Sequence, residues 1–271
     1  MALHKAVVLA RGLGSRMRRS DEAAGLTTGQ ARVAATGIKA LLPIGRPFLD
    51  YVLSALADAG YQQVCLVIGP EHQAIRDYYT RDRPPRRLAV SFAVQQEPRG
   101  TADAVLAAEA FAGDDEFLVM NSDNYYPTAV LMELRTAGEP TVPLFERETL
   151  IRESNIPYER LQSYAIGIVG DDGYLEGIVE KPDAATFAKF GDEAPISMNL
   201  WRFSPSIFQA CRRVKPSPRG ELELPQAVDL LVGKLGGRLR VIRCRTGVLD
   251  LSHRSDIAAV VERLRGFEAN P

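Results

Sequence analysis

A glycine-rich loop follows the first apolar run of the chain and could bind phosphate. Residues 7–10 (VVLA) lead directly into residues 11–17 (RGLGSRM). Glycines after a buried strand let backbone N–H groups approach phosphate oxygens without a clash from Cβ. Arg16 adds a planar, permanently charged group that matches phosphate geometry. The loop lacks the third glycine of GxGxxG and the Gly-Lys-Ser/Thr ending of a P-loop, so alone it indicates a phosphate loop and a plain tight turn about equally.

Two aspartates that follow apolar runs could hold a divalent cation. Asp123 comes after residues 117–120 (FLVM), and Asp250 comes after Val248 and Leu249. In open α/β sheets, ligands bind at the carboxyl ends of strands. Mg²⁺ is usually held by one or two carboxylates together with phosphates and waters. The alternative is that each aspartate only forms a turn or caps a helix, because the NSDN segment around Asp123 has good turn chemistry.

Two lysines are further candidates for a site, because both have apolar neighbours. Lys39 lies in an apolar setting, and Lys181 follows Glu180 at the end of an apolar pair of residues. The alternative for each is a solvated surface charge, which is the usual state of Lys and Glu. The apolar neighbours of Lys39 weaken that alternative, and the position of Lys181 indicates a side chain at the end of a strand.

The elements that must position these residues alternate in the first half of the chain. Runs typical of buried strands occur at residues 6–10, 64–69, 88–94 and 117–120. Segments with helical spacing lie between or after them, at residues 47–59, 75–79 and 101–111. This alternation predicts βαβ units and a mainly parallel sheet.

The second half is more mixed. Strands are expected at residues 164–169 and 177–179, on either side of a turn, and at residues 196–203 and 239–244. Helices are expected at residues 204–214, 223–235 and 255–264. Residues 19–38 are polar, small and long for a loop in a compact domain. We therefore expect either a mobile functional loop or a short helix there.

Composition excludes several other classes of protein. The chain has 271 residues, with 33 Lys and Arg against 34 Asp and Glu, so its net charge is −1. Such a chain does not attract polyanions in general, and its one basic run, residues 81–87 (RDRPPRR), reads as a solvated loop, so no nucleic acid is expected. Three scattered cysteines predict neither a disulfide framework nor a zinc site. With no run long enough to span a membrane or act as a signal peptide, we expect no membrane contact and a cytoplasmic location.

The glycine loop opens a resemblance to a known family. Residues 9–17 (LARGLGSRM) resemble the LAxGxGTRM signature of sugar-1-phosphate nucleotidyltransferases. Five further blocks follow in the family's order: residues 38–56 (IKALLPIGRPFLDYVLSAL), 97–105 (EPRGTADAV), 118–126 (LVMNSDNYY), 176–182 (EGIVEKP) and 248–257 (VLDLSHRSDI). Six ordered blocks are far more specific than any one of them.

The resemblance implies an α/β fold, a Rossmann-like three-layer domain with a mainly parallel mixed sheet. A single domain would cover residues 1–271, with a nucleotide-binding part at about 1–125 and a sugar-phosphate-binding part at about 126–271. It also implies an enzyme whose partners are a nucleoside triphosphate and a sugar 1-phosphate. An oxygen of the sugar phosphate attacks the α-phosphorus and releases pyrophosphate, with Mg²⁺ as cofactor. Self-association into a homo-oligomer is compatible with the sequence.

Residue roles carry over from the matching positions. Arg16 and Lys39 would contact the triphosphate, and Asp123 and Asp250 would hold Mg²⁺. Lys181, a third catalytic residue, would hold the sugar phosphate. The remaining implied contacts are with the nucleotide at Leu9, Ala10, Gly12, Gly14, Gln95, Gly100 and Thr101, and with the sugar at Glu180, Asn199 and Ala165.

Gln95 bears on the choice of base. It stands five positions before Gly100, as in family members that read uracil or thymine. An amide presents both a donor and an acceptor, which suits the imide edge of a pyrimidine. We therefore favour UTP or dTTP. The alternative is a polar strand end followed by a helix that Thr101 caps.

Several residues depart from the family pattern. Arg11 stands where Ala or Gly is usual, and could crowd the base or add a phosphate contact. Ala165 replaces a Gly next to the sugar, and Ser252 and His253 replace the Gly–Thr pair after the second aspartate. These departures leave two alternatives open: a cytidylyl- or guanylyltransferase acting on another phosphorylated acceptor, and a regulatory protein that binds nucleotide sugar without turnover.

Overall fold

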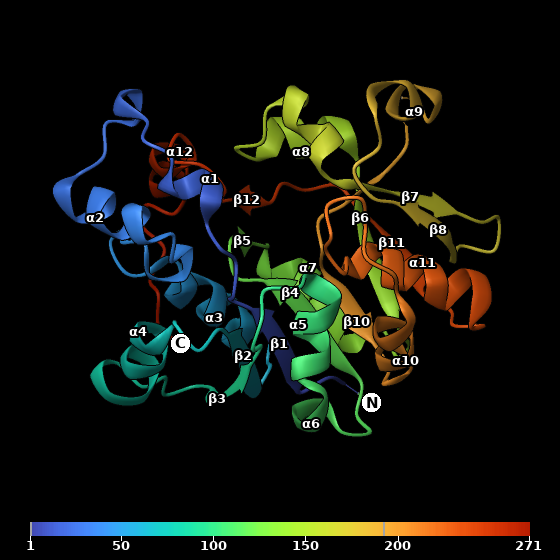
Figure 1. The fold of residues 1–271 in the computed structure, drawn as a ribbon, viewed down its shortest axis with the longest axis horizontal. Helices are drawn as coiled ribbons and strands as arrows, with labels where there is room; N and C mark the ends of the chain where they lie inside the picture. The colour runs from blue at the N-terminus through green and yellow to red at the C-terminus, as the bar shows by residue number, and fades with distance from the viewer. Residues whose placement is uncertain (1, 192) are drawn as a thin grey trace.

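The computed structural model describes residues 2–191 and 193–271. Within these residues the chain forms one ten-stranded sheet and a separate two-stranded sheet. The large sheet has the order β3-β2-β1-β4-β10-β6-β9-β7-β8, with β11 paired to β6. In Figure 1 the first half of the chain lies mainly on the left and the second half mainly on the right, while α12 returns to the left beside α1.

The first half follows the expected alternation. Its elements are β1 (Lys5–Leu9), α1 (Ser15–Arg18), η1 (Glu22–Ala24), α2 (Thr28–Thr36), η2 (Lys39–Leu41), α3 (Phe48–Asp58), β2 (Gln63–Ile68), α4 (Gln73–Asp77), η3 (Tyr78–Asp82), β3 (Ala89–Val94), α5 (Thr101–Ala107), α6 (Glu109–Ala112), β4 (Phe117–Asn121) and β5 (Asn124–Tyr125). The four strands β3, β2, β1 and β4 all pair in parallel. Their carboxyl ends therefore share one edge of the sheet.

The second half contains α7 (Thr128–Thr136), β6 (Thr141–Phe145), α8 (Arg147–Glu153), η4 (Tyr158–Ser163), β7 (Ala165–Val169), β8 (Leu175–Val179), α9 (Ala184–Lys189), β9 (Ile196–Ser197), β10 (Trp201–Phe203), α10 (Ser206–Arg213), α11 (Leu224–Lys234), β11 (Arg240–Cys244), β12 (Leu249–Asp250) and α12 (Asp256–Arg263). Here β8, β9 and β10 run against their neighbours. Across the described chain, the sheet is mixed but most strands share one direction, as expected.

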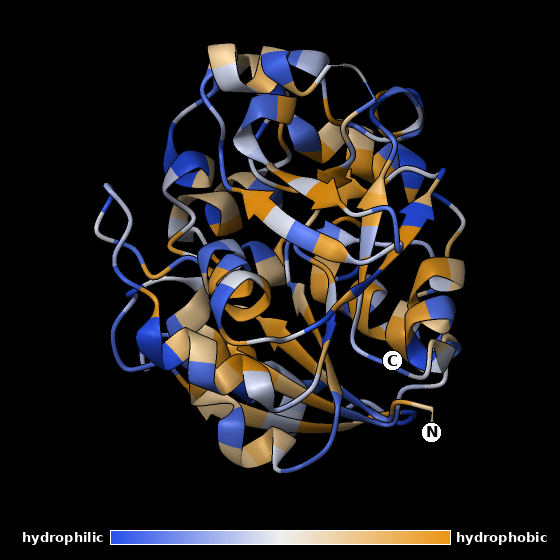
Figure 2. Ribbon diagram, turned by 90° about the vertical axis from the view of Figure 1, so that its right-hand side faces the viewer, coloured by the Kyte–Doolittle hydropathy of each residue, from blue (hydrophilic) through white to orange (hydrophobic). Residues whose placement is uncertain are grey.

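Alternating side chains of the strands divide the core between the two faces of the sheet. In β1, Ala6 and Val8 face one hydrophobic cluster, whereas Val7 and Leu9 face the other. The first cluster takes in residues of α3, α7 and α12, and the second takes in residues of α5, α10 and α11. Strands buried on both faces read as continuous apolar runs, and Figure 2 shows their hydrophobic colouring at the centre of the molecule. The three-layer prediction is confirmed.

Residues 19–38 form a short helix of their own, one of the two expected alternatives. Thr27 caps α2, because its hydroxyl accepts a hydrogen bond from Gln30 N while Gln30 Oε1 accepts one from Thr27 N. Gly37 ends the helix with a left-handed backbone at φ 79°. The segment thus contains both a capping box that starts the helix and a glycine that ends it.

Some predicted elements are wrong. Residues 196–203 form two strands, because Asn199 adopts a left-handed backbone at φ 58° that breaks the extended run. Asparagine tolerates this conformation better than most residues. Residues 101–111 form two helices separated at Ala108, and the short helix at residues 75–79 extends from Gln73 through the π-helical turn η3. The sequence analysis also missed α7, β6 and α8. Among the described helices, none has the length and apolar character to span a membrane.

Candidate active site

The glycine loop is held by a close backbone contact. Gly14 directly precedes α1 with φ 60°, and a Cβ there would lie 2.2 Å from the carbonyl oxygen of Gly37. Only glycine fits such a left-handed position against another backbone. The contact brings the end of α2 onto the loop, and Arg16 follows on α1 with an exposed side chain. The inserted helix therefore supports the loop that precedes it.

A cavity of about 310 Å³ opens above the carboxyl ends of the parallel strands. Its size falls within the range of small-molecule sites. The cavity brings together ten of the residues that the sequence analysis selected: Leu9, Ala10, Gly12, Gly14, Arg16, Lys39, Gln95, Gly100, Thr101 and Asp123. Arg11, Ser122, Glu221 and Ser252 line it as well.

The two candidate metal-binding aspartates lie at a pair of short strands, because Asp123 directly precedes β5 and Asp250 ends β12. β5 and β12 pair in antiparallel fashion, with Asn124 opposite Asp250. Leu251 N donates a hydrogen bond to the Asp123 carbonyl oxygen at 2.8 Å, and Asn124 Nδ2 donates one to Asp250 Oδ2 at 3.1 Å. Residues separated by more than 120 positions thus meet next to Asp123, which lines the cavity, whereas Asp250 itself does not line it.

A cation already accompanies each of these carboxylates. Lys39 forms an ion pair with Asp123, and Arg160 forms one with Asp250 while also bonding Asp256 at 2.6 Å. Burial raises the pKa of Asp250, and the nearby charge of Asp123 raises it further, although Arg160 and Lys39 oppose this. Two neighbouring carboxylates that repel each other favour a cation between them.

The donor set fits Mg²⁺ better than a metal that needs an all-protein cage. Among the described residues, no group of three or more His, Cys, Asp or Glu side chains is arranged to hold an ion. Mg²⁺ commonly takes one or two carboxylates and completes its shell with phosphates and water. Asp123 and Asp250 match that pattern.

Gln95 presents one hydrogen-bonding group to the cavity, not two. Its Nε2 donates to Gly100 O at 3.0 Å and to Asp103 Oδ2 at 2.8 Å. Both partners are acceptors, so the amide cannot be turned without facing oxygen to oxygen. Asp103 is itself paired with Arg99. The expectation that this amide offers both a donor and an acceptor is therefore wrong, and Oε1 alone is left for a ligand.

Thr101 and Gly100 contact a segment that the sequence analysis did not select. Thr101 does not cap its own helix, since its hydroxyl accepts from Leu224 N at 2.8 Å. Gly100 has φ 123°, and a Cβ there would lie 2.5 Å from Leu222 O. Leu222 N donates to Arg99 O at 2.7 Å, which closes the contact. In the structure, Gly100 accommodates this backbone.

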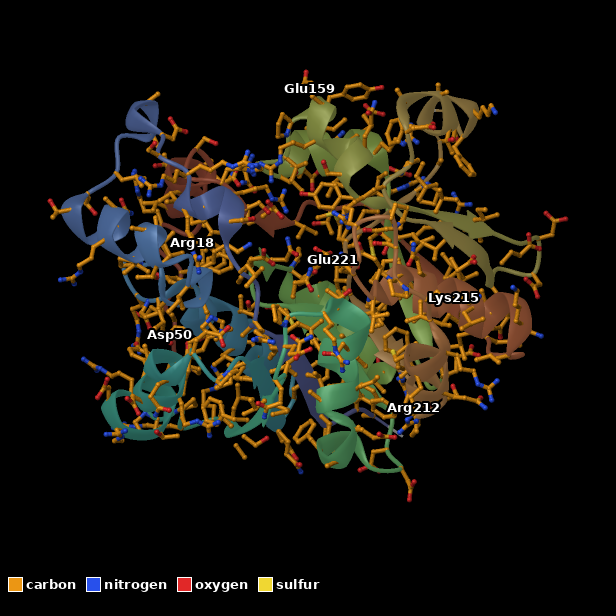
Figure 3. All side chains as sticks on the ribbon, in the orientation of Figure 1. Arg18, Asp50, Glu159, Arg212, Lys215 and Glu221 are labelled. Atoms are coloured by element: carbon orange, nitrogen blue, oxygen red, sulfur yellow. The ribbon has the colours of Figure 1, made fainter. Side chains whose placement is uncertain are left out.

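Residues 219–223 thereby connect the two halves of the molecule. Glu221 lines the cavity, and Figure 3 shows it near the middle of the molecule. Glu223 is paired with Arg219 and lies 3.9 Å from Lys181 Nζ. The available signal was the charged stretch RGELE, in which Arg219 and Glu223 are four residues apart and Gly220 permits a turn. Nothing in it identified the start of α5, on which it packs.

The expected sugar-binding residues lie outside the cavity. Lys181 Nζ is 3.1 Å from Glu180 Oε1, and burial raises the pKa of Glu180 although Lys181 opposes the shift. Asn199 lies in the left-handed turn between β9 and β10, and Ala165 begins β7 opposite Ser197. The structure brings Glu180 and Lys181 together but does not bring these four residues into one pocket with the nucleotide loop.

Asn155 and Arg160 were also missed. Asn155 exchanges two hydrogen bonds with the backbone of Asp250: Asp250 N donates to its Oδ1 at 2.8 Å, and its Nδ2 donates to Asp250 O at 2.7 Å. Together with Arg160, it fixes the position of the second aspartate. Both residues come from the α8–β7 connection, which carries no pattern that would distinguish it from a surface loop.

Comparisons with known proteins point to the same family as the sequence motifs do. Residues 5–246 match the family model described as nucleotidyl transferase. The chain is 28% identical to the UTP–glucose-1-phosphate uridylyltransferase AglF of Haloferax volcanii, over 96% of each chain. It is 31% identical to a glucose-1-phosphate thymidylyltransferase of Streptomyces griseus, over 84% of this chain but 57% of that protein. A solved UDP-glucose pyrophosphorylase complexed with UDP-glucose has the same fold, with a TM-score of 0.74 at 18% identity, covering 98% of this chain and 100% of that one.

Proposed function

From the premise that this chain belongs to the nucleotidyl transferase family, we propose that it joins a nucleoside triphosphate to a sugar 1-phosphate and releases pyrophosphate. The observation that carries the proposal is the cavity in which Arg16, Lys39 and Asp123 meet the glycine loop, with Asp250 on the neighbouring strand. The relatives of both named activities support the reaction class. The nucleotide part would be residues 1–125 and the sugar-phosphate part residues 126–271.

The reaction is a displacement between two anions. An oxygen of the sugar phosphate forms a bond to the α-phosphorus, and the bond from that phosphorus to the bridging oxygen of pyrophosphate breaks. The protein must neutralise charge and align the two groups, because no covalent intermediate with the chain is needed. Arg16 and Lys39 stand on the cavity side where the triphosphate would lie.

Asp123 and Asp250 would hold the divalent ion, which we propose to be Mg²⁺. When bound, this ion supplies charge neutralisation at the phosphates. Lys39 is paired with Asp123 and lines the cavity, so it can exchange that carboxylate for a phosphate oxygen without leaving the site. Arg160 and Asn155 keep Asp250 oriented meanwhile.

Lys181 would hold the phosphate of the acceptor, with Glu180 accepting hydrogen bonds from sugar hydroxyl groups. Residues 219–223 reach from this pair to the nucleotide cavity, so the two substrates would meet beneath Glu221. We further propose UTP or dTTP as the nucleotide. Their N3–H group is a donor that Gln95 Oε1 can accept. A cytoplasmic location and assembly into a homo-oligomer remain predictions from the sequence.

A pyrophosphate-release screen tests the proposal. We expect turnover with UTP or dTTP and a hexose 1-phosphate in the presence of Mg²⁺, and none after addition of EDTA. Turnover with CTP or GTP and a different phosphorylated acceptor would favour the alternative transferase, which the substituted sugar-side residues leave open. Tight binding of a nucleotide sugar without turnover across the panel would favour the regulatory protein.

A further inference from the structure

Arg11 is a charged residue buried in the wall of the nucleotide cavity. Its side chain is 6% exposed, and it lines the cavity beside Gly12. Its guanidinium lies over the backbone of Gly69, where an added Cβ would come within 2.4 Å of Arg11 Nε. Gly69 therefore leaves room for the arginine, and the sequence provides the space that this unusual residue needs.

The hydrogen-bonding capacity of Arg11 is not filled by the protein. Its Nε and Nη2 lie 3.3 Å and 3.4 Å from the two oxygens of Glu71, which is itself 45% exposed. Among the described residues, none provides a partner for Nη1, which is shielded from solvent. A buried guanidinium with long contacts and one unpaired nitrogen gains from any acceptor that approaches it. Because the contacts with Glu71 are long, a small tilt of the guanidinium that turns Nη1 toward the cavity would give up little hydrogen-bond energy.

The strand order places Arg11 on the base side of the cavity. Arg11 follows β1 but folds over the end of β2, and Gln95 follows β3, the next strand outward. Asp123 follows β4 on the opposite side of β1. The phosphate loop continues from Gly12 toward Lys39 and Asp123. Arg11 and Gln95 therefore flank the same end of the cavity, away from the candidate metal site.

These two side chains offer complementary groups to a ligand. Gln95 presents an acceptor, because both of its N–H groups are used within the protein. Arg11 can only donate. A uracil or thymine ring has an N3–H donor flanked by two carbonyl oxygens. Its imide edge therefore satisfies both residues at once.

We propose that Arg11 is a specificity-determining residue that donates a hydrogen bond from Nη1 to a carbonyl oxygen of the base next to N3–H. The inference rests on the proposed function, because it assumes that the cavity binds a uridine or thymidine nucleotide. It gives the chain a base contact from a position where related sequences usually have Ala or Gly.

Calorimetric binding of UTP, 2-thio-UTP and 4-thio-UTP, with Mg²⁺ and without acceptor, tests this role. Sulfur is a poor acceptor, so replacement of the oxygen that Arg11 contacts should weaken binding to the wild type by about fivefold. Arg11→Met should weaken UTP binding by about tenfold and abolish the difference between UTP and that thio analogue. The other analogue should keep the same ratio to UTP in both proteins.

Two variants make the result specific. Arg16→Met should weaken all three ligands by one common factor, as expected of a phosphate contact. Arg81→Met removes an exposed arginine paired with Asp77 and should change nothing. Thermal unfolding checks that Arg11→Met remains folded.

The outcomes separate the two proposals. If Arg11→Met weakens UTP and both analogues equally, or leaves all three unchanged, the base contact is overturned while the enzyme assignment stands. If the folded wild type binds no nucleoside triphosphate at all, the proposed function itself fails. Loss of the analogue difference in Arg11→Met alone establishes the contact.

Discussion

The two halves of the molecule reach the site in different ways. In residues 1–125 the strands β1 to β4 are parallel, and the residues that follow them line one cavity. In residues 126–271 the neighbours are mostly antiparallel, and Glu180, Lys181, Asn199 and Ala165 do not line it. Parallel strands end at a common edge, so local sequence suffices to bring their residues together. Neighbouring antiparallel strands end at opposite edges of the sheet, so long connections are needed to bring the residues that follow them to one edge.

The largest expected effect comes from replacement of Asp123, the residue of the first half that contacts Leu251, directly after β12 in the second half. Asp123→Asn should lower turnover by at least about a thousandfold, because the amide cannot neutralise a bound cation and loses the ion pair with Lys39. Pyrophosphate release measures this, and circular dichroism checks the fold. The matched control is Asp172→Asn, which changes an aspartate that is 60% exposed on the β7–β8 turn. Activity near the wild-type level in Asp123→Asn would remove Asp123 from the proposed metal site.

Replacement of Lys181 should impair binding of the sugar phosphate, which we assign to the second half, without affecting binding of the nucleotide to the first half. Lys181→Ala should raise the KM for the sugar phosphate by about tenfold to a hundredfold, because a charge-assisted contact with phosphate is lost. Nucleotide affinity, measured by calorimetry without acceptor, should stay the same. Lys189→Ala, on α9, is the matched lysine control. A change in nucleotide affinity larger than the change in KM would mean that the phosphate assignments are exchanged between the halves.

Glu180 should make acceptor binding sensitive to pH. Burial raises its pKa above the ordinary value of 4.5, so it takes up a proton at a higher pH than a solvated glutamate. The carboxylate form is the one that accepts hydrogen bonds from sugar hydroxyl groups. As pH falls through this raised pKa, the KM for the acceptor should therefore increase.

The ratio of KM values between the wild type and Glu180→Gln isolates this effect, because the titration of the sugar phosphate is common to both proteins. The ratio should be constant at high pH and change by a fewfold as pH falls. A ratio that stays flat down to pH 4.5 would show that Glu180 does not act as the acceptor. Nucleotide affinity should show no corresponding difference between the two proteins.

The contrast between the halves also explains which predictions succeeded. Apolar runs and glycine signals place Leu9, Gln95 and Asp123 at the ends of strands. Because these strands are parallel, their ends lie at one edge of the sheet, which brings the three residues to the same cavity. The pairing of Asn124 with Asp250 depends on a return of more than 120 residues, which no local pattern encodes. Motif resemblance supplied that aspartate, but not Arg160, which holds it.

The sequence did not predict the hydrogen-bond partners of one side chain in the first half or the backbone conformation of one residue in the second. The nature of the Gln95 amide suggested two groups for a base, but Asp103 and Gly100 occupy its N–H groups. The run at residues 196–203 has a strand composition, yet Asn199 turns the backbone. Nearby partners decide the first case and the backbone conformation of one residue decides the second, and neither follows from local composition.

The smallest expected effect concerns the inserted helix of the first half. Thr27→Ala removes the hydroxyl that accepts from Gln30 N, and should cost about 1 kcal/mol of stability. For a chain of this length, that corresponds to a decrease in Tm of about 2 °C. Thr28→Ala, at the adjacent exposed position inside α2, is the matched control and should leave Tm nearly unchanged. Because α2 reaches the glycine loop through the contact of Gly37 with Gly14, calorimetry of nucleotide binding completes the test. A loss of nucleotide affinity in Thr27→Ala at a temperature where the protein is folded would show that the glycine loop depends on this helix. The site in the first half would then depend on the inserted helix as well as on the ends of its parallel strands.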